Sequence, residues 1–287
     1  MTSRRAAGHT PALVWRDGAL DLDEPRVMGI LNVTPDSFSD GGRYPDPDAA
    51  VARAREMVAE GAAIVDVGGE STRPGAAPVG VDEELERVVP VVRGIRAELD
   101  VPVSVDTSKP EVIAAVAAEG AAMINDVRAL REPGALEAAA SADCAVCLMH
   151  MQGEPATMQD EPRYGDVVEE VCAFLEQRAD ACVDAGIPPD HLVLDPGFGF
   201  GKTGAHNLRL LHHLPELLDL GYPVLAGLSR KGIIGTLTGE QHAPDRLAGS
   251  VAAATIAAWL GAAIVRVHDV RATVQALAVA HAVRRAA

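Results

Sequence analysis

Short apolar runs rich in β-branched residues alternate along the chain with longer segments whose apolar residues fall at helical spacing. The eight apolar runs are residues 27–33, 64–67, 103–105, 123–124, 145–149, 192–194, 224–228 and 264–267. The helical segments between them include residues 48–60, 83–99, 111–119, 167–185 and 208–220. Strands that alternate with helices pair in parallel through right-handed crossovers. The pattern therefore predicts an α/β protein built on a parallel sheet.

Eight strand–helix units are the number that closes a single (β/α)8 TIM barrel, which takes about 250 residues. An open, doubly wound sheet is the alternative, and it usually contains fewer strands. No linker or low-complexity segment divides the 287 residues. We therefore predict an N-terminal extension over residues 1–25 and one barrel domain over residues 26–287.

A polar residue lies at or just after the end of each predicted strand. These residues are Asn32, Glu70, Asp106, Asn125, His150, Asp195, Ser229 and His268. In a barrel of parallel strands the carboxyl ends and the loops after them meet on one face, where active sites lie. A polar residue at one strand end means little, but polar residues at all eight strand ends favour an active site at the C-terminal ends of the strands.

Charge and cysteine content narrow the classes of function. The 25 Lys and Arg residues against 41 Asp and Glu residues give a net charge of −16, which disfavours nucleic acid as a partner. The four cysteines are too few for a secreted disulfide framework, and residues 1–20 lack an apolar signal core. Cys144 and Cys147 have the spacing of a redox or zinc pair, but no second pair completes a zinc site, so we interpret them as core residues. A cytoplasmic protein with reduced thiols is expected.

Residues 247–265 carry no charge and approach the length of a membrane span. Gly261 interrupts them, and residues 264–267 have the pattern of a strand. We interpret residues 250–260 as an Ala-rich helix that leads into a buried strand, and we expect no membrane segment. This helix is apolar on more than one face, which predicts that a second subunit covers it in a homodimer.

Two loops after predicted strands carry hydroxyl groups and glycines. Residues 32–42 combine Pro35 and a Gly-Gly pair with two Asp residues, which predicts a long polar lid. Residues 68–75 place Thr72 and Arg73 between glycines, and both side chains can donate hydrogen bonds to an oxyanion. Ser108 and Glu111 have the spacing of a capping box, which predicts a helix start directly after Asp106.

Residues 195–203 contain two near-matches to phosphate-binding motifs. A P-loop requires Gly at Pro196, and the dinucleotide fingerprint requires Gly at Lys202. We therefore assign the glycines to a tight loop and the chemistry to Asp195. Lys231, Arg266 and His268 follow or end the last two strands and supply positive charge where such barrels often bind phosphate.

These loops together resemble the dihydropteroate synthases, a family of pterin-binding barrels, from about residue 27 to residue 270. The motifs recur in family order: the Asn32 loop, Glu70-Ser-Thr-Arg-Pro, Asp106-Thr-Ser-Lys, Ile124-Asn-Asp, Leu148-Met-His-Met-Gln-Gly, Asp195-Pro-Gly-Phe-Gly, Ser229-Arg-Lys and Arg266-Val-His-Asp. Gly232 departs from the family pattern, which usually has Ser or Arg there. The departure bears on the start of the local helix and not on Lys231.

The resemblance implies a transferase that joins 6-hydroxymethyl-7,8-dihydropterin pyrophosphate to p-aminobenzoate and releases pyrophosphate. It implies a pterin pocket of Asp106, Asn125, Met149, Asp195, Phe200, Gly227 and Lys231. It implies pyrophosphate contacts from Asn32, Thr72, Arg73, Arg266 and His268, and a p-aminobenzoate pocket of Phe38, Pro74, Ser229 and Lys231. Catalytic roles fall to Asp106, Asp195, Lys231, Arg266 and His268. Mg²⁺ would bridge pyrophosphate to Asn32, with Asp40 as a second candidate ligand, and sulfonamides would act as inhibitors.

Two other functions fit the same barrel. A pterin-dependent methyltransferase would use the pterin pocket without a pyrophosphate site, and Arg266, His268 and Arg73 argue against it. A non-catalytic binding protein would have lost a strand-end residue, and none is lost.

Overall fold

Eight parallel strands form the centre of the protein in the computed structural model, which describes residues 12–34, 46–71, 78–154 and 157–286. The strands are β3 (Arg26–Asn32), β4 (Ile64–Gly68), β5 (Val103–Asp106), β6 (Met123–Asp126), β7 (Ala145–Met149), β8 (Leu192–Asp195), β9 (Leu225–Ala226) and β10 (Ile264–Val267). Their order is β8-β7-β6-β5-β4-β3-β10-β9, and a parallel bridge between Leu194 and Val224 joins the two edges. The barrel prediction is confirmed, and the open doubly wound sheet is excluded.

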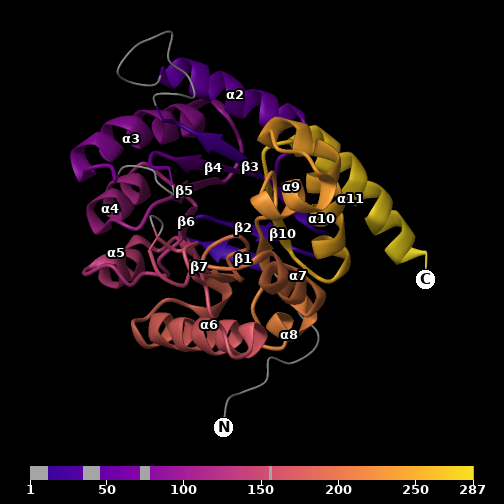
Figure 1. Ribbon diagram of the computed structural model, residues 1–287. Coiled ribbons are helices and arrows are strands. Elements are labelled where there is room, and N and C mark those ends of the chain that lie inside the picture. The colour runs from indigo at the N-terminus through magenta and orange to yellow at the C-terminus, as the bar shows by residue number, and fades with distance from the viewer. Residues whose placement is uncertain (1–11, 35–45, 72–77, 155–156, 287) are drawn as a thin grey trace.

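Helices follow the strands and cover the outside of the barrel (Figure 1). They are α2 (Pro47–Ala59), α3 (Val81–Glu98), α4 (Pro110–Ala118), α5 (Ala135–Ala142), α6 (Val167–Asp184), α7 (Gly204–His212), α8 (Leu214–Leu218), α9 (Gly232–Thr238), α10 (Leu247–Trp259) and α11 (Val270–Arg285). Two short 3-10 turns, Pro189–His191 and Ala243–Arg246, precede β8 and α10. The main core lies between the helices and the outer face of the barrel, where Val, Leu, Ile and Ala side chains pack together.

The helical stretch predicted over residues 208–220 is two helices. The first, α7, ends at His212, and α8 begins at Leu214 with Pro215 in its first turn. Proline has no backbone N–H and fits the first turn of a helix but not its interior. Pro215 therefore starts a new helix where the apolar spacing alone suggested a continuous one.

The predicted capping box at Ser108 is wrong. Helix α4 begins at Pro110, and its N-cap residue Lys109 makes no side-chain capping bond. The Ser108 hydroxyl donates instead to the Asp126 carboxylate at the end of the neighbouring strand. Proline at the first helical position sets the backbone angle and has no N–H that would need an acceptor, and this helix starts without the serine cap.

The described part of the N-terminal extension is a hairpin that closes one end of the barrel. Strands β1 (Ala12–Trp15) and β2 (Gly18–Asp21) pair antiparallel. Leu13 and Leu22 are buried in a cluster with Met28, Ile64, Met123 and other side chains from the amino ends of the barrel strands. Residues 12–22 thus cover the face opposite the strand carboxyl ends, which the sequence analysis did not anticipate.

The cysteines and the uncharged stretch lie as expected. Cys144 and Cys147 are 3% and 0% exposed and sit in the core as free thiols. The uncharged stretch forms α10 and then β10. Among the described helices, none has the length and hydropathy needed to cross a membrane.

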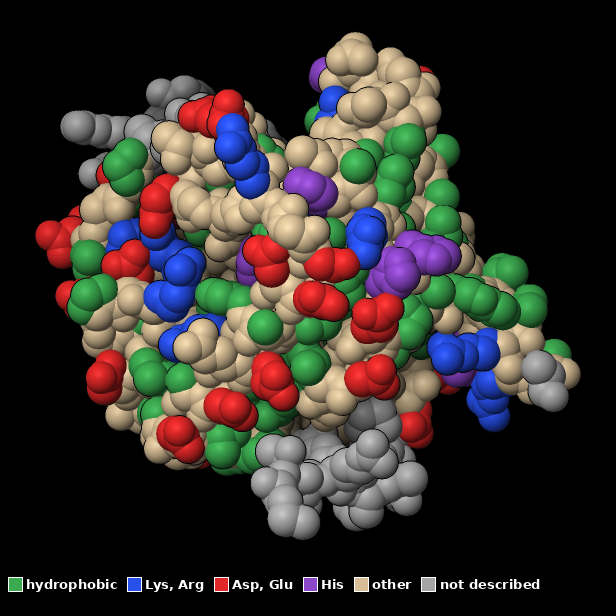
Figure 2. Space-filling view, turned by 60° about the horizontal axis from the view of Figure 1, so that its bottom comes forward, with side chains coloured by type: hydrophobic (Ala, Val, Ile, Leu, Met, Phe, Trp, Pro, Cys, Tyr) green, Lys and Arg blue, Asp and Glu red, His purple; other side chains and the backbone are tan. Residues whose placement is uncertain are grey.

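Acidic side chains are spread over the face shown in Figure 2, with Lys and Arg side chains lying among them. This face therefore carries charges of both signs.

Candidate active site

Four charged or amide side chains from neighbouring strands meet inside the barrel near the strand carboxyl ends. The Arg266 Nε donates to Asp66 Oδ2 at 2.6 Å, and Arg266 Nη2 donates to Asp106 Oδ2 at 2.9 Å. The Asn125 amide donates to the same Asp66 oxygen at 3.2 Å. Since β4, β5, β6 and β10 are parallel, their inward-facing residues lie at matching heights and can form this network.

Asp66 is a member of this site that the sequence analysis missed. It is completely buried in the middle of β4, and its Oδ1 has no hydrogen-bond partner among the described residues. A carboxylate inside an otherwise apolar run is a signal that could have identified it, because buried charges are rare unless they are paired or functional.

Burial and charge act in opposite directions on the network. Burial raises the pKa of Asp106 to about 7, while the Arg266 guanidinium lowers it and the Asp66 carboxylate raises it further. Burial lowers the pKa of Arg266, but Asp66 and Asp106 more than offset this and hold it above its ordinary value. One guanidinium is thus shared by two carboxylates in a desolvated site, where removal of the guanidinium would leave both carboxylates without a countercharge.

Asp195 and Lys231 form the second part of the site. Asp195 is the last residue of β8, and Lys231 lies in the segment that follows β9. Burial raises the pKa of Asp195, and hydrogen bonding from the Gly197 N–H at 2.7 Å and the charge of Lys231 oppose that rise. Burial lowers the pKa of Lys231 to about 8, together with repulsion from Arg266. The Lys231 ammonium lies 4.0 Å from the centroid of the Phe200 ring. Opposite charges therefore lie beside an aromatic face.

An apolar wall adjoins these charges. Phe200 and Met149 belong to one buried cluster with Val127, Met151 and Met158. Gly227 follows β9, and a side chain built there would come no closer than 4.0 Å to Arg266. The structure thus brings the predicted pterin-pocket residues to one end of the barrel.

Two ion-paired residues hold Lys231 in place. Arg230 has a left-handed backbone with φ of 58°, which is uncommon for a residue other than glycine. The Arg230 guanidinium binds Asp269 through two hydrogen bonds, at 3.0 and 2.6 Å. The Arg230 backbone N–H donates to the Ser250 hydroxyl at 2.9 Å. These contacts stabilise the strained backbone conformation of Arg230, directly before Lys231. Helix α9 starts at Gly232, so the departure at that position leaves the helix start in place.

Ser229 and His268 contact each other at the ends of neighbouring strands. The Ser229 Oγ lies 3.0 Å from His268 Nδ1 and accepts a hydrogen bond from the His268 N–H at 3.2 Å. Asn32, at the end of β3, is half-buried. Phe38, Asp40, Thr72, Arg73 and Pro74 lie outside the described residues.

The loop after β8 explains why glycines recur in it. A side chain at Gly197, where φ is 67°, would place Cβ 1.9 Å from the His150 carbonyl oxygen. Gly201, where φ is 61°, approaches the Gln152 carbonyl oxygen almost as closely, at 2.3 Å. The assignment of these glycines to a tight loop, and not to a nucleotide motif, is confirmed.

The available ligands fit Mg²⁺ only as an ion shared with a substrate. In the described part of the chain no three His, Cys, Asp or Glu side chains cluster in a way that could hold a metal. The Asn32 carboxamide supplies one hard oxygen at the barrel mouth, which suits Mg²⁺ because that ion keeps several waters and takes substrate phosphates as ligands.

Comparison with known proteins identifies the family. Residues 28–268 match the family model described as pterin binding enzyme. The dihydropteroate synthase of Escherichia coli K12 is 56% identical over 264 residues, covering 92% of this chain and 93% of that protein. The dihydropteroate synthase of Yersinia pestis, solved with a sulfonamide drug, is 53% identical with a TM-score of 0.91, covering 96% of this chain and 99% of the other.

A third relative is the dihydropteroate synthase of Xanthomonas albilineans, solved with 4-aminobenzoic acid. It is 56% identical with a TM-score of 0.91, and the match covers 96% of this chain and 99% of the other. A further structure of that enzyme holds 7,8-dihydropteroate. These relatives are synthases, which decides against the methyltransferase and the non-catalytic alternatives. The chain therefore belongs to the pterin-binding enzymes and, among them, to the dihydropteroate synthases, which are transferases.

Proposed function

We propose that this chain condenses 6-hydroxymethyl-7,8-dihydropterin pyrophosphate with p-aminobenzoate to give 7,8-dihydropteroate and pyrophosphate. The observation that carries the proposal is the placement of buried Asp195 and half-buried Lys231, each in the other's electrostatic field, at the same end of the barrel as the Asp66–Arg266–Asp106–Asn125 network. The relatives bind 4-aminobenzoic acid, sulfonamide or 7,8-dihydropteroate, which supports the same substrates here.

The pterin ring presents N–H donors on one edge and oxygen and nitrogen acceptors on another. The Asp195 carboxylate accepts two N–H bonds from the 2-amino and ring N–H edge, in a charge-assisted pair. Lys231 donates to a ring oxygen or nitrogen, and Asp106 and Asn125 bind the remaining edges. Met149 and Phe200 give the ring an apolar face, and Gly227 leaves room beside it.

The pyrophosphate would lie at the ends of β3 and β10. Arg266 has five N–H donors, and its hydrogen bonds to Asp66 and Asp106 use one each, so donors remain for a phosphate oxygen. His268, Thr72 and Arg73 add further contacts. Asn32, with Asp40 as a second candidate, would hold Mg²⁺, which when bound would neutralise charge on the leaving pyrophosphate.

The chemistry is a substitution at the methylene carbon beside the ring. Its bond to the pyrophosphate oxygen breaks, and positive charge spreads into the ring, where the Asp106 and Asp195 carboxylates stabilise it. The amine of p-aminobenzoate forms the new carbon–nitrogen bond and releases one proton. An aryl-ammonium is acidic, so no strong base is needed. Phe38, Pro74, Ser229 and Lys231 would form the pocket for the arylamine.

A pyrophosphate-release assay tests this function directly. Release of pyrophosphate from the pterin substrate is expected only when p-aminobenzoate is added, with dihydropteroate formed in equal amount.

Sulfonamides are expected to compete with p-aminobenzoate, because they mimic its shape. Purely noncompetitive inhibition would contradict a shared pocket, and release without dihydropteroate would indicate a hydrolase.

The order of binding is a second prediction. The p-aminobenzoate pocket includes Phe38 and Pro74 from the loops whose Arg73 and hydroxyl groups are proposed to bind the anion. We expect p-aminobenzoate to bind roughly 10-fold or more tightly once pyrophosphate, Mg²⁺ and a pterin analogue are present, as positive coupling between ligands. Calorimetric titration with and without those ligands measures the ratio. Equal affinities would mean that the pocket is complete before the anion binds.

A homodimer is the third prediction. Large apolar side chains are exposed on α9, α10 and α11, among them Leu237, Ile256, Trp259, Val279 and Val283. Ile256 and Trp259 lie one helical turn apart on α10 and are 49% and 50% exposed, and exposed apolar side chains that cluster on a surface often mark an interface. Light scattering at micromolar concentration should give twice the 29.9 kDa mass of the chain.

Substitution of both Ile256 and Trp259 by Glu should reduce the mass to that of a monomer. The matched control is Val183→Glu on α6, an exposed apolar residue elsewhere on the surface, which should leave the mass unchanged. A monomeric wild type would contradict the prediction.

We also place the protein in the cytoplasm, because its four cysteines are free thiols and three of them are buried.

A further inference from the structure

Lys202 is a lysine buried to 3% exposure in the loop that follows β8. Its ammonium lies within hydrogen-bond distance of four acceptors. These are the carbonyl oxygens of Gly197 and Phe200, both at 3.0 Å, and the carbonyl oxygen and Nδ1 of His150, at 3.3 and 2.9 Å. A buried lysine is costly unless its charge is compensated, so this one needs a reason.

The four acceptors fix where the proton lies. Carbonyl oxygens only accept, and an ammonium has three N–H donors to give them. His150 must then present an unprotonated Nδ1, and burial together with the Lys202 charge lowers the pKa of His150 to about 3. Burial lowers the pKa of Lys202 to about 7, while the Asp195 carboxylate acts in the opposite direction. Of the two groups, Lys202 therefore holds a proton in preference to His150 Nδ1.

The acceptors belong to the two segments that frame the pterin pocket. Gly197 and Phe200 are in the loop after β8, and His150 follows β7. Within this loop the Phe200 N–H donates to the Gly197 carbonyl oxygen at 3.1 Å, and the Gly199 N–H donates to the Asn207 side chain at 2.7 Å. Asp195 stands at the start of the loop, and the Phe200 ring lies beneath the Lys231 ammonium. The Lys202 ammonium thus connects the loop that carries Asp195 and Phe200 to the end of the adjacent strand.

We propose that Lys202 is a positioning residue for the pterin site: its buried ammonium, accepted by His150 and by the loop carbonyls, holds Asp195 and Phe200 at the places where they meet the pterin. The inference rests on the proposed function and deepens it. Without the ammonium, three carbonyl oxygens and an imidazole nitrogen would face one another with no donor between them, and the loop would move to separate them.

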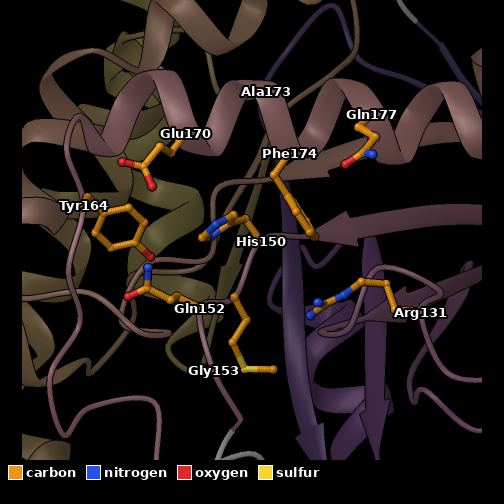
Figure 3. A pocket seen from close by; sticks show the side chains of 10 residues that line it. Arg131, His150, Gln152, Gly153, Tyr164, Glu170, Ala173, Phe174 and Gln177 are labelled. Atoms are coloured by element: carbon orange, nitrogen blue, oxygen red, sulfur yellow. The ribbon is translucent and has the colours of Figure 1, made fainter.

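The His150 side of this arrangement borders an open groove of about 540 Å³. Its wall includes Tyr164 and Phe174, and Figure 3 shows the His150 ring between these two aromatic side chains. The Tyr164 hydroxyl donates to the Gly201 carbonyl oxygen at 2.8 Å, so the groove wall also supports the loop. Small solutes can therefore reach the side chain next to Lys202 from solvent.

The test is Lys202→Met, which keeps most of the length and the apolar volume but removes the charge. Calorimetry with a pterin analogue should show affinity lowered roughly 10- to 100-fold, the range expected for losing hydrogen bonds to a charged group. The KM for the pterin pyrophosphate should rise similarly, while the KM for p-aminobenzoate at saturating pterin should stay within about two-fold. A variant that only unfolds more easily would lower kcat and leave both KM values unchanged.

Rescue separates charge from packing. In Lys202→Ala, propylammonium should restore pterin affinity in part, and propanol, which has the same shape without the charge, should not. Arg16→Met is the matched control, because Arg16 also donates to a backbone carbonyl, that of Ala142, but at the opposite end of the barrel. Its pterin affinity should equal that of the wild type.

Unchanged pterin affinity in folded Lys202→Met, or equal rescue by propanol, would overturn the proposal. Should Lys202→Met fail to fold, Lys202→Gln, which keeps two N–H donors, takes its place with the same two readouts. Absence of pterin binding by the wild-type protein would instead contradict the proposed function.

Discussion

A pterin analogue should no longer bind measurably when Asp195 or Lys231 is replaced by Ala. Asp195 is buried and Lys231 is half-buried, and each side chain lies in the other's electrostatic field at the predicted pterin pocket. Each substitution would remove a charged hydrogen bond to the pterin and leave the pterin group without its partner in a desolvated site. We therefore expect the affinity for the analogue to fall by at least roughly 100-fold. Calorimetry with the analogue measures the loss.

Two further variants make this experiment specific. Asp195→Asn keeps the shape and one acceptor but removes the charge, and it should bind with intermediate affinity. Asp190→Ala alters an exposed carboxylate in the turn before β8, at the other end of the same strand, and should bind like the wild type. Wild-type affinity in both the Asp195→Ala and Lys231→Ala proteins would refute the pterin assignment.

Replacing Arg266 with Met should destabilise the fold as well as abolish activity. The guanidinium is the shared partner of Asp66 and Asp106, which are 0% and 8% exposed. Removing one member of a buried ion pair costs roughly 3–5 kcal/mol of unfolding free energy, because the remaining charges lose their compensation. Urea unfolding of the variant and the wild type measures the difference.

The loss should be larger at pH 8 than at pH 6. Burial raises the pKa of Asp106 from its ordinary 3.8 to about 7 despite Arg266. The folded protein therefore binds a proton that the unfolded chain has released, and the free energy of unfolding falls as pH rises from about 4 to about 7. Without Arg266 the folded pKa rises further, so the variant continues to lose stability above pH 7, where the wild type no longer does.

The control is Arg93→Met, which removes a bidentate pair with Glu119 at 3.0 and 2.7 Å on the surface. Solvent screens this pair, so its removal should leave the unfolding free energy almost unchanged at both pH values. An Arg266→Met protein as stable as this control would show that the buried carboxylates find other compensation.

Much of the site could be predicted from the sequence because the barrel imposes a simple rule. Each strand ends at the same face, so a polar residue after an apolar run is placed there by the chain direction alone. Asp106, Asn125, Asp195 and Lys231 follow that rule, and the structure brings them together at one end of the barrel. Their chemical roles came from the resemblance of the motifs and remain predictions.

Local sequence failed where a choice depended on distant partners. Ser108 has the spacing of a helix cap, but Asp126 on the next strand competes for its hydroxyl, and proline already starts the helix. The hairpin of residues 12–21 gave no clear pattern, because its burial comes from side chains at the amino ends of the barrel strands.

The sequence by itself determined the number of strands, their direction and the face on which polar residues gather, because these follow from apolar periodicity and chain connectivity. Only the tertiary structure decided which charges pair. Arg266 meets Asp66 across 200 residues, and Lys202 meets His150 across 52. A strand buried on both faces gives no pattern that separates inward from outward residues. The partners of Asp66 and Lys202 are therefore set by the closed barrel, which brings distant strands side by side.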